Sequence, residues 1–246
     1  MKSGNQKHGG VMPSYPEDCI QYLANDDWWV TDDSNVLHRG MLIETYVQFY
    51  YQIPFQLVAE RIAHDDHTTA RFAVSSLNAS GNARPRPSLP VASMPQLQGA
   101  DCFIFNRAKK RPCLVLGAVE QKAVKKVLTR GMSKALTAPF FLVAPFFGIP
   151  QKGRSGYNPQ FVDRIIHAEY SAFFWDILPH ERGCESILRL DQIQPIGAHH
   201  HSYKHLGYRL SEEAMMVMDE RLDWIISGER RGEFLSAFHT LITEQE

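Results

Sequence analysis

The most constraining feature of the sequence is a basic cluster that runs directly into an apolar, β-prone segment. The cluster ends at Arg111, and Pro112 then leads into Cys113–Leu116 (CLVL). A second apolar segment, Phe140–Phe147 (FFLVAPFF), follows after a basic connection. Short apolar runs that follow polar or proline-containing segments are typical of buried strands. We therefore expect two core strands of a small barrel, with Arg111 fixed at the mouth where the first strand begins.

Most of the remaining pattern also indicates a mainly β fold, a β-barrel with C-terminal helices. Further strands are predicted at Met41–Phe49, Phe55–Arg61, Thr68–Leu77, Cys102–Asn106 and Ser186–Ile196. Helices are predicted within Cys19–Val30, from about Pro159, over Ser211–Ser227 and over Phe234–Ile242. Ser211 is a good N-cap for its helix, and Gly228 provides a stop signal.

Three segments are expected along the chain. Residues 1–38 form an N-terminal tail and short helix, residues 39–90 an N-terminal β unit with a Pro-rich linker, and residues 91–246 the barrel with its C-terminal helices. The linker, residues 78–90 (NASGNARPRPSLP), contains three prolines and no apolar period. A similar layout of glycine, proline and apolar pairs on its two sides indicates two β units in tandem, with chance likeness as the alternative.

The charge is balanced overall but unevenly distributed. The net charge of −1 excludes a general attraction to nucleic acid or membranes. However, nine Lys or Arg lie between positions 107 and 134 against the single acid Glu120, whereas Ser211–Glu246 holds nine acids against three arginines. The pattern fits either a basic binding face with an acidic helix or mixed surface charges that cancel in space.

Compartment signals point to a cytoplasmic bacterial protein. The apolar runs are far shorter than a membrane span, and the N-terminal segment lacks the apolar core of a secretory signal. The four cysteines show no CxxC spacing, so reduced thiols are expected. No membrane partner is predicted.

Four motifs occur in a consistent order along the second half of the chain. They are Arg111–Leu116 (RPCLVL), Phe141–Pro145 (FLVAP), Glu185–Ile193 (ESILRLDQI) and Leu210–Glu213 (LSEE). With these motifs, residues from about Gly99 to Gly228 resemble the PemK/MazF-like toxin family. The resemblance implies an SH3-like β-barrel with a C-terminal helix packed on it. Family members with toxin activity are metal-independent endoribonucleases, usually dimers, that an antitoxin neutralises. A homodimer and an antitoxin-like or other protein partner are therefore implied.

The resemblance also implies the chemistry, in which the ribose 2′-hydroxyl attacks the adjacent phosphodiester. Arg111 matches the family's arginine, and its planar cation suits the extra charge of the transition state. The family's threonine falls on Phe146 or Phe147, so no hydroxyl stands at that position. His205 is a candidate general base in its place. Candidate contacts to single-stranded RNA are Arg107, Lys109, Lys110, Lys122, Lys125 and Lys126.

Each of these assignments has a structural alternative. Arg111 also fits a strand-end residue that binds carboxylates or backbone, the lysines fit a solvated turn, and the phenylalanines of the second strand fit the core. Trp28 and Trp29 fit anchors that dock on the chain's own domain. The histidines at positions 199–201 and 205, and the loop Ala63–His67, contain metal-ligand types, but no metal or other cofactor is predicted because the spacing is poor.

Two functions follow from these observations. The first is a PemK/MazF-like endoribonuclease or RNA-binding protein of a toxin–antitoxin-like system. The second is a non-catalytic module of the same fold that docks a protein partner.

Overall fold

The structure is a computed structural model, and it describes residues 13–24, 27–34, 36–77, 91, 94, 101–118, 140–149, 156–181 and 184–245. The chain divides into two compact units. Unit 1 contains Met1–Tyr46 and Lys110–Glu246, and unit 2 contains Val47–Lys109. The predicted linker at 78–90 lies outside the described residues.

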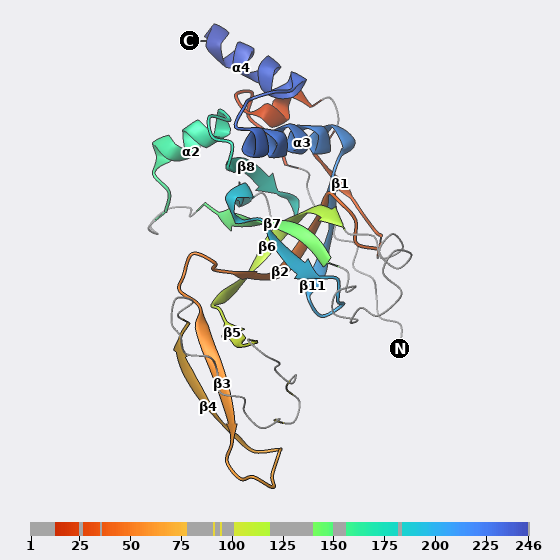
Figure 1. Cartoon of the computed structure of the whole chain (residues 1–246). Helices are drawn as coiled ribbons and strands as arrows, with labels where there is room; N and C mark the ends of the chain where they lie inside the picture. Colours follow the sequence, from red (N-terminus) through yellow and green to blue (C-terminus); the bar gives the residue numbers. More distant parts are fainter. Residues whose placement is uncertain are drawn as a thin grey trace, which may run out of the picture. The chain divides into compact units, whose positions relative to one another are not determined.

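Unit 1 is built on an open β-sheet with strands from both ends of the chain (Figure 1). The strands are β1 (Trp29–Thr31), β2 (Met41–Gln48), β6 (Ala108–Ala118), β7 (Phe140–Gly148), β8 (Phe173–Leu178), β9 (Cys184–Arg189), β10 (Gln194–Gly197) and β11 (Tyr203–Leu210). Their order is β1-β11-β2-β6-β7-β9-β8, and β10 pairs with β7. The mainly β prediction is confirmed. Within the described residues no pairing joins β1 to β8, so this sheet is not closed into a barrel.

The segment predicted as one strand at Ser186–Ile196 is two strands joined by a 3-10 turn, Leu190–Gln192. Leu188 pairs with Phe146, and Gln194 pairs with Val143. The two pairs are six residues apart along this segment but only three residues apart along β7. Three residues of the segment therefore lie outside the strand pairing. The local alternation is that of a strand, but the interruption depends on the partner strand, which the pattern does not show.

The predicted helices begin and end close to their expected positions. Helix α3 spans Glu212–Ser227; the Ser211 side chain accepts a hydrogen bond from the Ala214 N–H, and Gly228 ends the helix at φ 75°. Helix α2 spans Pro159–Ile166 and α4 spans Glu233–Gln245. The expected N-terminal helix is only a 3-10 turn, Ile20–Leu23, before β1.

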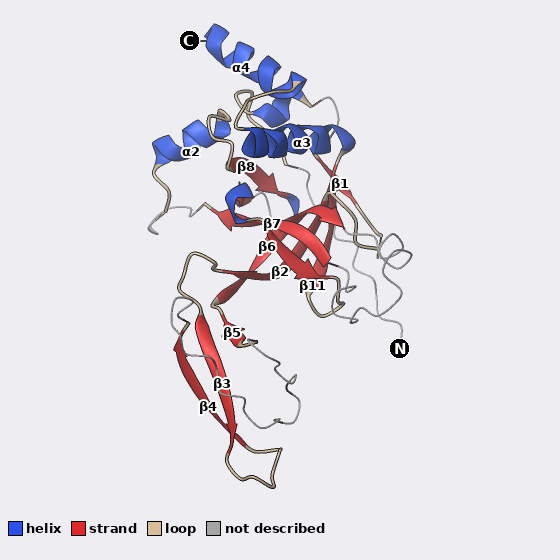
Figure 2. Cartoon of the chain, in the orientation of Figure 1, coloured by secondary structure: helices blue, strands red, loops and turns tan. Residues whose placement is uncertain are grey.

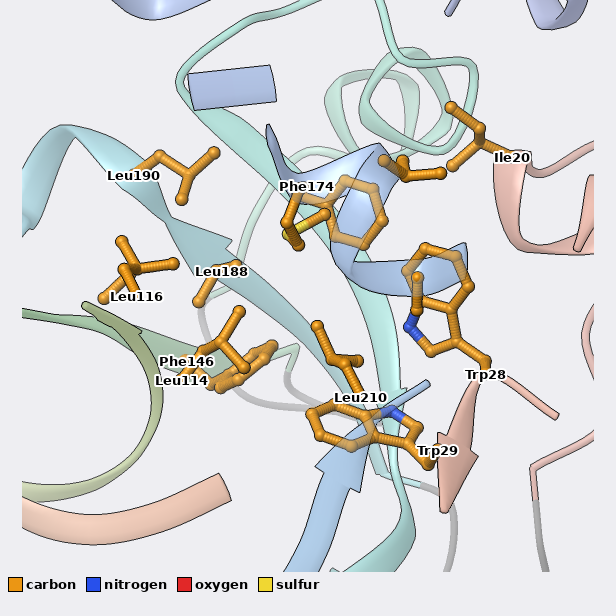
Figure 3. Close-up of a cluster of buried hydrophobic side chains, with 14 of the residues drawn as sticks. Ile20, Trp28, Trp29, Leu114, Leu116, Phe146, Phe174, Leu188, Leu190 and Leu210 are labelled. Carbon is orange, nitrogen blue, oxygen red and sulfur yellow. The ribbon is translucent and has the colours of Figure 1, made fainter. Parts of the chain in front are cut away.

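Unit 1 buries one face of its sheet against α3, α4 and the N-terminal turn (Figure 3). The cluster includes Leu114 and Leu116 from β6, Phe146 from β7, Leu188 from β9 and Phe174 from β8. A second cluster joins α2 to Trp175 and Ile187 on the β8–β9 strands. Both faces of the β7–β9–β8 region are thus packed, which fixes the strand ends that carry the candidate site.

Asp176 anchors the N-terminal segment to β8. Its buried carboxylate accepts hydrogen bonds from the Tyr15 hydroxyl at 2.7 Å, Trp28 Nε1 at 3.1 Å and Trp29 Nε1 at 3.3 Å, and from the Ile177 N–H at 2.7 Å. Both indoles are buried, so the docking of Trp28 and Trp29 on their own domain is confirmed. Desolvation raises the pKa of Asp176 to about 7, although these hydrogen bonds oppose the shift.

Arg221 performs a similar role from α3. Its fully buried guanidinium donates to the carbonyl oxygens of Ala168 (3.4 Å), Tyr170 (3.0 Å) and Phe173 (3.1 Å). Burial lowers the pKa of Arg221 to about 9, so the group stays charged at neutral pH. The arginine therefore ties α3 to the loop that leads into β8.

Unit 2 contributes a three-stranded antiparallel sheet. Its strands are β3 (Phe55–Arg61), β4 (Ala70–Ser76) and β5 (Phe103–Phe105), in the order β4-β3-β5. Strands and loops make up the described part of this unit, which contains no helix (Figure 2). The strand predicted at Phe55–Arg61 has the predicted bounds, and the other two are shorter than predicted.

In the part of the chain that the structure describes, no helix combines the length and hydropathy that a bilayer crossing requires. The cysteines at positions 19, 102, 113 and 184 are free thiols.

Candidate nucleic-acid interface around Arg111

Arg111 lies on β6 and stacks on an aromatic ring of β7. Cys113 pairs with Pro145. Arg111 and Phe147 lie two residues further along their antiparallel strands, so their side chains project from the same face of the sheet. The guanidinium carbon of Arg111 is 3.7 Å from the centroid of the Phe147 ring. The side chain is half-buried, with Nε shielded from solvent. The ring therefore holds the guanidinium in place through a cation–π contact.

The structure distinguishes Phe146 and Phe147, the two residues that the resemblance predicts at the position of a threonine. Phe146 points into the core and is 1% exposed, whereas Phe147 is half-buried and contacts Arg111. Phe147 thus occupies the position beside the arginine. A phenyl ring has no proton to donate and no lone pair to accept one, so it cannot take a hydroxyl's part in acid–base chemistry.

A second arginine approaches the same ring from β9. The guanidinium carbon of Arg189 is 5.5 Å from the Phe147 centroid and 4.8 Å from the Phe173 centroid. Adding the distances of the two arginines from the Phe147 centroid limits their separation to 9.2 Å. Two guanidinium groups therefore contact one ring at this end of the sheet.

Asp191 holds Arg189 in this position. The pair is bidentate, with Nε to Oδ1 at 2.6 Å and a terminal nitrogen to Oδ2 at 2.5 Å. This hydrogen bonding raises the pKa of Arg189. Because Asp191 lies on the looped-out turn between β9 and β10, the same irregularity that interrupts the strand also orients the arginine.

An aromatic wall continues from this site toward α2. Phe173 contacts both Phe161 (5.4 Å) and Tyr170 (6.0 Å), and Phe161 also contacts Tyr157 at 5.9 Å between ring centroids. Arg164 lies 5.0 Å from the Tyr170 ring. Single-stranded nucleic acids bind to surfaces that combine aromatic rings with cations. Tyr157, Phe161, Tyr170 and Phe173 are also partly buried against the second hydrophobic cluster.

His205, the candidate general base, lies on β11, which is separated from β6 by β2 in the sheet. Burial lowers its pKa; the carboxylates of Asp32 and Asp33 oppose that shift, and His38 adds to it. His38 is itself paired with Asp32, with Nε2 to Oδ2 at 2.8 Å. The histidine therefore belongs to a carboxylate–imidazole group on the other side of β2, and its role as a base stays a prediction.

The predicted RNA-binding residues have different positions. Lys110, in unit 1, forms an ion pair with Glu44 at 2.5 Å. Arg107 and Lys109 fall in unit 2, where the Arg107 guanidinium lies 5.1 Å from the Phe49 ring centroid. Three further candidates, Lys122, Lys125 and Lys126, lie outside the described residues.

Neither of the two segments that contain metal-ligand residue types, residues 199–205 and the loop Ala63–His67, forms a metal site. Over the described ranges, no group of three or more His, Cys, Asp or Glu side chains is arranged to hold a metal ion. The rings of His199 and His200 are stacked, and the His201 ring is tilted against them, with 3.8 Å between the centroids of His200 and His201. In the Ala63–His67 loop, Asp66 accepts hydrogen bonds from the Thr68 and Thr69 hydroxyls, which lower its pKa.

Sequence reasoning missed Arg189, Asp191 and Phe173. Arg189 and Asp191 lie within the Glu185–Ile193 motif, where they alternate with apolar residues at the end of a strand. Charged residues two apart at a strand end are a recognisable signal for a shared face. Their aromatic partner Phe147 comes from another strand, so the pattern alone does not pair them.

Comparison with known proteins identifies no relative. No family model matches the chain. No curated protein and no solved structure matches it either.

Proposed function

We propose that this chain is a PemK/MazF-like protein that binds single-stranded RNA at Arg111 and cleaves it slowly without a metal. In this proposal the open sheet of unit 1 is a variant of the family's SH3-like barrel fold, and the chain acts in the cytoplasm as part of a toxin–antitoxin-like system. The observation that carries the proposal is the Arg111 guanidinium held 3.7 Å from Phe147, with Arg189 close to the same ring.

The chemistry is a transesterification. The ribose O2′ attacks the adjacent phosphorus, the P–O5′ bond breaks, and the products are a 2′,3′-cyclic phosphate and a 5′-hydroxyl. The O2′ proton leaves to a base, and the departing O5′ takes a proton. Arg111 stabilises the extra negative charge that develops on the phosphoryl oxygens. Phe147 contributes no proton transfer, which is why slow cleavage is expected.

A non-catalytic module is the second candidate. The phenyl ring in the place of the family's threonine favours it, because that exchange removes a group able to move a proton. Such a module would keep the arginine pair as a binding surface for RNA or for a protein partner.

The decisive experiment incubates the full chain with a long single-stranded RNA in excess EDTA. We expect cleavage products that end in a cyclic phosphate, and we expect cleavage and binding to decline together in Arg111→Ala. Losing one charge-assisted contact of about 1.5–3 kcal/mol should weaken RNA binding about 10- to 100-fold. The matched control is Arg231→Ala, which removes an exposed arginine paired with Glu229 ahead of α4.

The outcomes separate the candidates. Cleavage that survives EDTA and is lost only in Arg111→Ala supports the endoribonuclease. Intact RNA with Arg111-dependent binding supports a non-catalytic RNA-binding module. Intact RNA without binding rejects both RNA functions and leaves the protein-docking module.

The pH dependence of cleavage tests His205. If its imidazole is the base, the rate should rise with pH and level off below the usual histidine range, because burial lowers the pKa. If the rate instead keeps rising through neutral pH, and His205→Asn leaves this profile unchanged, hydroxide is the base and His205 has no catalytic role.

A further inference from the structure

The connection that follows β1 is tied to an irregular point of β11. Strand β11 is in register with β2 at His205 and again at Arg209, but four residues separate these positions on β11 and only two separate their partners on β2. The strand therefore bulges between them. Gly207 lies in this bulge at φ 85°, a left-handed conformation that glycine adopts without strain. Its carbonyl oxygen accepts a hydrogen bond from the Asp32 N–H at 2.9 Å, which holds the start of the connection on the bulge.

The carboxylate of Asp32 organises the same connection and is almost fully buried. Its Oδ1 accepts a hydrogen bond from the Ser34 N–H, and its Oδ2 forms an ion pair with His38 Nε2, both at 2.8 Å. The other ring nitrogen of His38, Nδ1, lies 2.9 Å from the Arg39 carbonyl oxygen. The Arg39 guanidinium is itself paired with Asp219. Asp32 therefore binds His38 from one side while its own N–H binds the bulge.

His205 brings a second imidazole to this carboxylate. Its Nε2 is shielded from solvent and has no hydrogen-bond partner among the residues that the structure describes. Burial lowers the pKa of His205 from its ordinary value of 6.5. The charge of Asp32 opposes this shift, that of His38 adds to it, and that of Asp33 opposes it. Two histidines thus depend on one buried carboxylate.

The strands around His205 supply no acceptor in its place. On β2 it pairs with Ile43, and on its own strand Tyr203 lies two residues away on the same face. Arg209 follows on that face beyond the bulge, where its guanidinium donates to a backbone carbonyl. Lys204 and Glu44 project from the opposite face, because successive strand residues alternate. A proton on His205 therefore has to be accommodated by the connection after β1.

That connection accommodates it poorly. A protonated His205 adds a second cation beside the carboxylate that already pairs with His38, and its shielded Nε2–H would be a buried charged donor without an acceptor. We propose that Asp32, His38 and His205 form a proton-operated latch. At neutral pH the latch holds residues 32–34 on the bulge of β11, and in mild acid it releases them so that the His205 imidazolium contacts water.

The sign and size of the response follow from the one proton gained. Because the pKa of His205 is lowered in the held arrangement, that arrangement is most stable above pH 6.5 and loses stability as the pH falls below it. A single proton changes the ratio of released to held molecules by at most about tenfold per pH unit. The proposal does not rest on RNA binding or cleavage.

The test is amide hydrogen exchange of the full chain, measured by NMR without RNA from about pH 7.5 to about pH 5 and corrected for intrinsic exchange. The protection of the Asp32 and Ser34 amides should fall by up to about tenfold per pH unit below pH 6.5, whereas the amides that join β7 to β9 should keep theirs. His205→Gln should abolish this dependence, because its amide gains no proton. The matched control, His239→Gln on an exposed position of α4, should retain it.

His38→Gln covers the case in which His205→Gln disturbs the strand. Without the competing cation, Asp32 can pair with a protonated His205, so the loss of protection in acid should become smaller. Constant protection in the wild type overturns the proposal, as does a dependence that persists in His205→Gln. If His205→Gln is unprotected at every pH, an undiminished dependence in His38→Gln overturns it. Parallel loss of protection between β7 and β9 overturns it as well, because the whole unit would then be opening.

Discussion

Asp176→Ala should detach the N-terminal segment and destabilise the whole of unit 1. Asp176 is 1% exposed, and its carboxylate accepts hydrogen bonds from the Tyr15 hydroxyl and from the indole N–H groups of Trp28 and Trp29. Alanine removes the acceptor but leaves the donors buried. The substitution therefore acts through unsatisfied donors as well as through lost contacts.

The structure gives the size of the effect. A buried donor without a partner costs about 1–3 kcal/mol, and Tyr15 is only partly buried, so the three side chains together should cost roughly 3–6 kcal/mol. Native domains are stable by only about 5–15 kcal/mol. Asp176→Ala should therefore lose a large part of the free energy of unfolding, and the segment containing Trp28 and Trp29 should lose its packing.

The substitution Asp176→Asn tests the effect of the charge on Asp176 separately from the loss of its side chain. Burial raises the folded-state pKa of Asp176 to about 7, above the ordinary value of 3.8. The folded state therefore binds the proton more tightly, and the stabilisation is fully present below pH 3.8 and is lost as the pH rises through 7. The shift corresponds to on the order of 4 kcal/mol. Because Asn cannot ionise, the free energy of unfolding of Asp176→Asn should improve relative to the wild type from pH 5 to pH 8.

Urea unfolding followed by tryptophan fluorescence at several pH values measures both effects. Asp163→Asn, on the exposed side of α2, is the matched control for the removal of an aspartate. If Asp176→Asn instead loses stability relative to the wild type as the pH rises, the carboxylate is stabilised by its donors and desolvation does not dominate. That result would refute the reasoning.

Three further substitutions test the packing and the site. Arg221→Ala should cost about 3–5 kcal/mol of unfolding free energy because three carbonyl groups lose their buried donor; a loss below 1 kcal/mol in urea unfolding would contradict this estimate. Phe147→Thr should place a hydroxyl beside Arg111 and remove the ring on which the arginine stacks. RNA affinity should therefore fall several-fold in a filter-binding assay, while the cleavage rate per bound RNA rises. Unchanged affinity would show that the stacking does not hold the arginine. Ser211→Ala should cost about 1 kcal/mol through loss of the α3 N-cap, and thermal unfolding identical to the wild type would refute that role.

Local signals account for most of the secondary structure. Strand β3 follows from the short apolar and β-branched run within Phe55–Arg61, and α3 follows from an apolar stripe between the Ser211 cap and the Gly228 stop. Each of these signals depends on neighbouring residues only. The N-terminal 3-10 turn, Ile20–Leu23, is shorter than the predicted helix because Trp29 belongs to β1, and the pairing of β1 with β11 depends on residues far away in the chain.

The sequence predicts Arg111 as part of the candidate site but does not predict Arg189. Arg111 stands out because it ends a basic cluster next to an apolar, β-prone segment, and both signals are local. The prediction that the strand begins at Arg111 is wrong, because β6 begins three residues earlier, at Ala108. Arg189 becomes part of the site only because β9 pairs with β7 and because three residues loop out before β10. Strand pairing of this kind is set by the whole sheet, so no local pattern carries it.

Position 147 links the geometry to an expectation about kinetics. The phenyl ring there cannot transfer a proton, but it holds the Arg111 guanidinium in place. If the chain binds RNA as proposed, a fixed guanidinium attracts the phosphodiester of the bound RNA as well as the more highly charged transition state. The part of that attraction common to both states increases affinity but leaves the barrier between them unchanged. Only the additional charge of the transition state speeds the reaction, so this arrangement should favour tight binding with slow turnover.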